Sequence, residues 1–109
     1  KVKIDEIANL LPDIKTFDRS LVWNSDLIEA MELENLLGQA QVTMHSAANR
    51  KESRGAHMHE SFSDRNDKEW MKHTIAHLKD GKVDITYRPV HEYTLTDEID
   101  YIKPKPRVY

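Results

Sequence analysis

The stretch that decides the fold is NSDLIEAMELENLLGQAQVTMHSAANRKESRG, residues 24–55. Its apolar and small residues recur every three or four positions, a spacing that places them on one face of a helix. That face comprises Ala30, Leu33, Leu36, Leu37, Ala40, Met44, Ala47 and Ala48. At 1.5 Å per residue such a helix is roughly 40 Å long, too long to bury its own apolar face, so it needs partners.

Both ends of the predicted helix carry recognisable signals. Asn24, Ser25 and Asp26 are successive cap candidates, and Asp26 and Glu29 have the spacing of a capping box. At the other end, glycine is the usual left-handed residue that follows a helix. We therefore predict that the helix runs to Arg54 and stops at Gly55.

The flanking segments predict smaller elements. Residues 1–11 read as a short amphipathic helix, and Asn66 followed by Glu69 has the spacing of a second helix start. Residues 70–78 fit either a continuation of that helix or the first strand of a hairpin. Asp80-Gly81 favours a two-residue type I′ turn, so we prefer the hairpin. Its predicted cross-strand pairs are Leu78–Val83, Ala76–Ile85, Thr74–Tyr87, His77–Asp84 and His73–Arg88.

Composition excludes several classes of protein. The 109 residues suit one small domain, and 16 basic against 19 acidic residues lack the charge excess of a general nucleic-acid binder. No apolar run approaches the roughly 20 residues that a membrane helix requires. With no cysteine, the chain supplies no disulfide or thiolate ligand. Because the amphipathic pattern begins at Lys1, which is not an initiator methionine, we expect a piece of a longer polypeptide.

Metal, cofactor and catalytic sites all have weak signals. The six histidines are candidates for a metal site only where they approach one another; in a hairpin His73 and His77 lie roughly 13 Å apart, too far for one ion. The three glycines lie in separate elements, so no glycine-rich phosphate loop is present. Glu52, Ser53 and His57 share a segment without a spacing that indicates an active site. We therefore assign no catalytic, cofactor-binding or metal-binding residue. The six histidines are His45, His57, His59, His73, His77 and His91.

The segment RKESRGAH, residues 50–57, is the densest polar cluster in the chain. Arginines at a rigid helix end suit bidentate pairing with carboxylates or carbonyls of another surface. We predict a docking patch, with an ordinary solvated helix end as the alternative. Its residues are Arg50, Glu52, Ser53, Arg54, Gly55 and His57.

Four stretches together resemble one family. WNSDLIEAMELENLLGQA, RKESRGAH, FSDRNDKEWMKHT and VDITYRPV resemble the C-terminal region of the succinate dehydrogenase flavoprotein subunit. Fumarate reductase flavoproteins and L-aspartate oxidase carry related versions of the E-S-R-G-x-H motif. The resemblance runs from about Ile4 to Tyr109, nearly the whole chain.

The resemblance implies a mainly α fold, an up-and-down helical bundle like a spectrin repeat. Residues 1–71 would form the bundle domain, without the first helix of the family, and residues 72–109 a β-hairpin with an extended, irregular tail. A missing helix predicts exposed apolar surface on the long helix.

The resemblance also implies a parent enzyme that oxidises succinate to fumarate with FAD and passes electrons to an iron–sulfur subunit and quinone. The fragment itself would hold no FAD, and its docking patch would face the flavin-binding domain of the same subunit. The parent would lie peripherally on the cytoplasmic or matrix face of an inner membrane, without inserting into it. Alternatives are a fumarate reductase or L-aspartate oxidase parent, or an independent helical interaction module.

Overall fold

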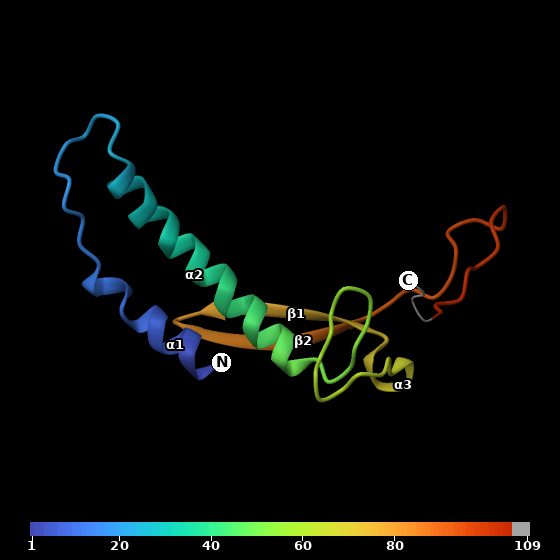
Figure 1. The fold of residues 1–109 in the computed structure, drawn as a ribbon. Helices are drawn as coiled ribbons and strands as arrows, with labels where there is room; N and C mark the ends of the chain where they lie inside the picture. Colours follow the sequence, from blue (N-terminus) through green and yellow to red (C-terminus); the bar gives the residue numbers. More distant parts are fainter. Residues whose placement is uncertain (106–109) are drawn as a thin grey trace.

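The computed structural model describes residues 1–105, in which one long helix contacts both a short helix and a β-hairpin (Figure 1). The molecule is elongated, with principal extents of 61 × 34 × 31 Å. The end of the predicted tail, residues 106–109, lies outside the described residues. The elements in chain order are α1 (Val2–Asn9), the 3-10 turn η1 (Leu11–Asp13), α2 (Ser25–Asn49), α3 (Asp67–Trp70), β1 (Lys72–Lys79) and β2 (Lys82–Pro89).

The predicted hairpin and its register are confirmed. β1 and β2 pair antiparallel from Lys72 opposite Pro89 to Lys79 opposite Lys82, which includes every predicted cross-strand pair. Asp80 and Gly81 form the turn with φ of 50° and 70°. Two successive left-handed residues are what a type I′ turn needs, and its twist matches that of the strands.

The predicted helical bundle is wrong. In the described part of the chain α2 is flanked by the short α1 and by a two-stranded antiparallel sheet, and by no second long helix (Figure 1). The hairpin packs closely on α2 at Gly38, where a Cβ would lie 3.6 Å from Cδ2 of Leu78. The helical periodicity of α2 specified an apolar face but not the kind of element that covers it.

Both ends of α2 also differ from the prediction. The helix ends at Asn49 rather than Arg54, because Arg50 is already extended with φ −79° and ψ 99°. At the start, the cap is Asn24, whose side chain accepts a hydrogen bond of 2.8 Å from the Leu27 N–H. Asp26 is not part of a capping box; its carboxylate accepts from the backbone N–H groups of Phe17 and Asp18, at 2.7 and 3.1 Å.

A polar contact holds α1 against α2. The carboxylate of Asp5 accepts hydrogen bonds from Gln41 Nε2 and His45 Nε2, each 3.1 Å long. The hydrogen bond from Gln41, then that from His45, lowers the pKa of Asp5 below its usual value. Gln41 is buried beside Leu37, so the interior under α1 is small and partly polar.

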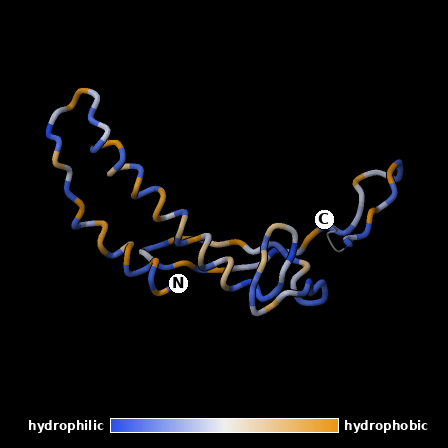
Figure 2. The backbone as a smooth tube through the Cα atoms, in the orientation of Figure 1, coloured by the Kyte–Doolittle hydropathy of each residue, from blue (hydrophilic) through white to orange (hydrophobic). Residues whose placement is uncertain are grey.

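The predicted exposure of apolar surface on the long helix is confirmed. Met31 and Leu36 are each 63% exposed, and Trp23, in the loop before the helix, is 97% exposed. Figure 2 shows apolar stretches along this loop and the amino-terminal half of α2, the part of the molecule that the hairpin does not cover. None of the helices in residues 1–105 is both long and apolar enough to span a bilayer.

Candidate functional site

The cluster of residues 50–57 begins where the chain leaves α2 and turns back on itself. Arg54 and His57 form an isolated antiparallel bridge, with N–O distances of 2.8 and 3.0 Å between their backbones. Gly55 lies between them with φ of 58°, a left-handed conformation that glycine adopts without strain. Gly55 therefore permits a tight turn within the cluster, and not the end of the helix.

Glu52 lies at the centre of the cluster and is completely buried. Its carboxylate accepts hydrogen bonds from Arg54 Nε at 2.8 Å, Arg50 Nε at 2.9 Å and the Asn66 backbone N–H at 2.9 Å. Burial alone would raise the pKa of Glu52, but the bonds from Arg54, Asn66 and Arg50 outweigh it and lower the pKa from 4.5 to about 2. A buried carboxylate with this many donors stays ionised at neutral pH.

Arg50 ties this cluster to the hairpin. Its Nη2 donates to the carbonyl of Trp70 at 2.6 Å, and its Nη1 donates to the carbonyl of Lys72 at 3.0 Å and to Thr74 Oγ1 at 3.2 Å. Together with the bond to Glu52, these contacts use every nitrogen of the guanidinium group. Arg50 is thus a structural clamp between the end of α2 and the start of β1.

Two of the three guanidinium nitrogens of Arg54 bind carboxylates of the cluster and its surroundings. Its Nε and Nη2 pair with Glu52, and Nη2 also reaches Asp67 at 2.6 Å. These partners raise the pKa of Arg54 above its ordinary value, the bond to Glu52 most strongly. Among the described residues, Nη1 makes only a weak contact of 3.9 Å with the sulfur of Met71.

Ser53 and His57 close the loop that follows. Ser53 Oγ donates to the carbonyl of Phe62 at 2.7 Å and accepts from the His59 N–H at 2.9 Å. His57 Nε2 lies 3.2 Å from the carbonyl of Arg50. The structure therefore brings all six predicted site residues together in one network of hydrogen bonds and turns.

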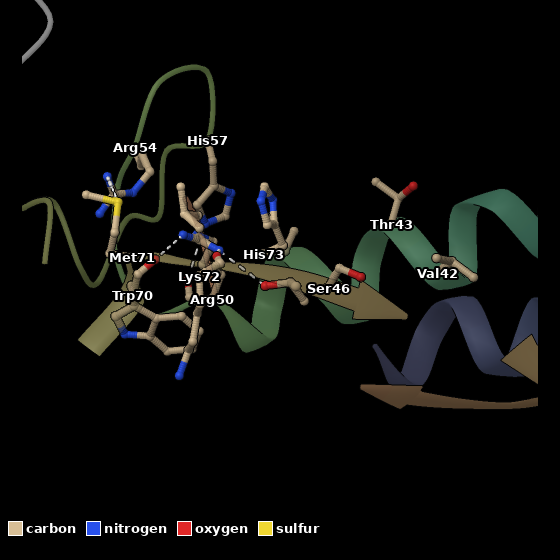
Figure 3. A pocket seen from close by; sticks show the side chains of 13 residues that line it. Val42, Thr43, Ser46, Arg50, Arg54, His57, Trp70, Met71, Lys72 and His73 are labelled. Atoms are coloured by element: carbon tan, nitrogen blue, oxygen red, sulfur yellow. Dashed lines mark hydrogen bonds between the residues drawn. The ribbon is translucent and has the colours of Figure 1, made fainter. Parts of the chain in front are cut away.

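A groove of about 720 Å³ opens beside the cluster, between α2 and the start of β1 (Figure 3). One wall is a stripe along α2 that includes Val42, Thr43, Ser46 and Ala47. The titratable residues that line the groove are all basic: Arg50, Arg54, His57, Lys72 and His73. Figure 3 shows these side chains gathered at one end, with the α2 stripe running away from them.

Sequence reasoning missed the partners of the cluster. Asp67 and Asn66, which contact Arg54 and Glu52, follow them by 13 and 14 residues, and no local pattern links the pairs. The ammonium of Lys72, 4.7 Å from the ring centre of Trp70 and 4.1 Å from that of Tyr87, was also missed. What pointed to this region was the density of polar residues of both charges together with the family resemblance.

Within residues 1–105 the structure brings together neither the side chains of a metal site nor a glycine-rich loop. Among residues 1–105 no three His, Asp or Glu side chains come close enough to hold a metal ion. Gly38, Gly55 and Gly81 lie in a helix, a loop and a hairpin turn, so they form no phosphate-binding loop that would fit FAD. What the arrangement offers chemically is a rigid, basic, groove-bearing surface.

Comparison with known proteins bears on the origin of this surface. The family described as "Fumarate reductase flavoprotein C-term" matches residues 1–109. The chain is 60% identical over 107 residues to the succinate dehydrogenase flavoprotein subunit of Rickettsia felis, covering 97% of this chain and 18% of that protein. It is 58% identical over 97 residues to the mitochondrial succinate dehydrogenase [ubiquinone] flavoprotein subunit of Oryza sativa, covering 89% of this chain and 15% of that protein.

A solved structure is similar in fold as well as in sequence. An E. coli quinol fumarate reductase chain superposes with a TM-score of 0.78 at 34% identity, covering 91% of this chain and 17% of that one. The chain thus spans less than a fifth of the length of each of these relatives.

Proposed function

This chain belongs to the fumarate reductase flavoprotein C-terminal family, and we propose that it is the C-terminal docking domain of a succinate dehydrogenase flavoprotein subunit. The observation that supports the proposal is the 60% identity to a dehydrogenase subunit over almost the whole chain. The solved fumarate reductase shares 34%, so the dehydrogenase is the first candidate for the parent and the reductase the second.

In this proposal the parent subunit oxidises succinate to fumarate with FAD, and its electrons pass to an iron–sulfur subunit and then to quinone. The complex would lie at the cytoplasmic or matrix face of an inner membrane, with this domain outside the bilayer. The domain supplies no catalytic group. Its contribution is a surface that holds the flavin-binding domain of the same subunit in place.

The residues of the polar cluster have different roles in this proposed docking. Arg50, Glu52 and Ser53 have their side chains bonded within the domain, and Gly55 provides the turn, so these four give the surface its shape. Arg54 and His57 both line the groove, and within residues 1–105 Nη1 of Arg54 makes only a weak contact of 3.9 Å with the sulfur of Met71. We therefore assign the direct interdomain contacts to Arg54 and His57.

The test uses the full-length subunit carrying Arg54→Ala, with Arg19→Ala as the control because Arg19 lies exposed in the loop before α2. Bound flavin per polypeptide and succinate-dependent dye reduction are measured, and circular dichroism checks that the secondary structure is retained. We expect Arg54→Ala to lower flavin retention and turnover while Arg19→Ala leaves both unchanged. Full flavin occupancy with normal turnover in the Arg54 variant would contradict the proposal. The ratio of succinate oxidation to fumarate reduction distinguishes the two candidate parents.

A further inference from the structure

The groove beside the cluster has an unusual charge distribution for a chain with a net charge of −3. Its lining includes two arginines, a lysine and two histidines, and no aspartate or glutamate. The nearest acidic partners, Glu52 and Asp67, are engaged by arginines: Glu52 by Arg50 and Arg54, and Asp67 by Arg54 and Arg65. Three arginines thus share two carboxylates, and Lys72, which forms no salt bridge within residues 1–105, adds a further positive charge to the lining of the groove.

Arg54 provides a specific contact point for an incoming anion. Its Nη1 carries two N–H donors, and its one contact within residues 1–105 is the weak 3.9 Å approach to the Met71 sulfur. Nε and Nη2 are held by Glu52 and Asp67, so the plane of the guanidinium group is fixed before any partner arrives. A pre-oriented arginine loses little conformational entropy when it pairs with a carboxylate.

The shape of the groove suits a stretch of polypeptide. Thr43, Ser46 and Ala47 present short side chains along α2, which lets another backbone approach closely. Val42 and Met71 add apolar surface. An apolar floor with a few polar groups at one end binds a partner by burial and orients it by charge. A volume of about 720 Å³ exceeds what a single ion needs.

We propose that this groove receives a segment of the flavin-binding portion of the same subunit, which is seated by an acidic side chain whose carboxylate pairs with Nη1 of Arg54. The proposal rests on the proposed function, since it names the chemistry of the partner at the docking surface. The Rickettsia felis subunit has the length to supply such a segment, because this chain covers 18% of it.

The first experiment identifies the occupant in the full-length subunit, assembled in its complex. A photo-crosslinking amino acid replaces Thr43 in the groove or, as a control, Gln39, which lies one turn earlier on α2, exposed and outside the groove. After irradiation, mass spectrometry identifies the linked peptides. We expect Thr43 to link to a peptide that contains Asp or Glu and precedes the Lys1 position in the parent sequence, with a yield at least about tenfold above that of Gln39.

The second experiment tests the role of charge. His73→Glu adds a negative charge at the groove, whereas Thr86→Glu adds the same charge at an exposed residue of β2 that does not line the groove. His73 lies opposite Arg88, so the new glutamate gains an opposite charge across the strands and the hairpin is retained. We expect His73→Glu to reduce the Thr43 crosslink about tenfold and Thr86→Glu to leave it unchanged.

Three results would overturn the inference. In the first experiment these are crosslinks from Thr43 to the iron–sulfur subunit or to a second copy of this subunit, and crosslinks confined to residues 1–109. In the second experiment it is a crosslink to an upstream peptide whose yield His73→Glu does not reduce. None of these three results contradicts the proposed function if Arg54→Ala still lowers flavin retention. The proposed function would be contradicted by a separate result, namely normal flavin retention in the Arg54→Ala variant.

Discussion

Replacing Glu52 with glutamine removes the charge at the centre of the cluster while keeping the shape of the side chain. Glu52 is fully buried and its pKa is lowered from 4.5 to about 2, which corresponds to about 3 kcal/mol of stabilisation at neutral pH at about 1.4 kcal/mol per pKa unit. Breaking one partner of a buried ion pair typically costs about 3–5 kcal/mol. We therefore expect Glu52→Gln to lower the free energy of unfolding at pH 7 by about 3 kcal/mol.

The pH dependence of this loss has a definite sign. Because the pKa of Glu52 is lower in the folded chain, its ionisation stabilises the fold above pH 4.5, and this contribution disappears as the pH falls toward 2. The difference between the native chain and Glu52→Gln should thus be largest and constant from pH 6 to 8. It should fall to roughly half or less at pH 3.

The assay is urea unfolding followed by far-UV circular dichroism at pH 7, 5, 4 and 3. Glu32→Gln serves as the control, because Glu32 is an exposed glutamate on α2. A thermal melt should show a shift of roughly 12–24 °C for Glu52→Gln, given about 3 kcal/mol and about 4–8 °C per kcal/mol in a domain of this size. The reasoning fails if the two chains differ by less than about 1 kcal/mol at pH 7, or if their difference is the same at pH 3.

The remaining predictions concern local elements. Asp5→Asn weakens the contact between α1 and α2, so amides of Val2–Asn9 should exchange hydrogen faster while those of the hairpin do not change, and uniform acceleration would contradict this. Gly81→Ala should destabilise the chain by about 1 kcal/mol, because Gly81 has a left-handed φ of 70°. Gly38→Ala should instead stabilise the chain by about 0.5–1 kcal/mol, because alanine favours the helix and α2 has room for the methyl group. The midpoint of denaturant unfolding measures both effects. Asn24→Ala should cost about 1 kcal/mol in the same measurement through loss of the cap, and an unchanged midpoint would disprove the role of Asn24.

The elements that follow from local physics were predictable from the sequence. Asp80-Gly81 specifies a type I′ turn, and the turn in turn sets the register of every residue pair in the hairpin. Asn66 caps a short helix by accepting from the Glu69 N–H at 3.2 Å, as its spacing predicted. These interactions join residues a few positions apart, so a local sequence pattern is enough to predict them.

The sequence by itself therefore determined the long helix, the hairpin and its register, and family membership, because these depend on periodicity, on turn residues and on motifs. Only the tertiary structure decided where α2 ends, what covers it, and which partners the side chains of the cluster bind within the domain. Arg50 leaves the helix because its guanidinium group finds the carbonyls of Trp70 and Lys72, about 20 residues onward. Contacts between residues so far apart in the sequence depend on how the elements pack in the folded chain, so no local sequence pattern predicts them.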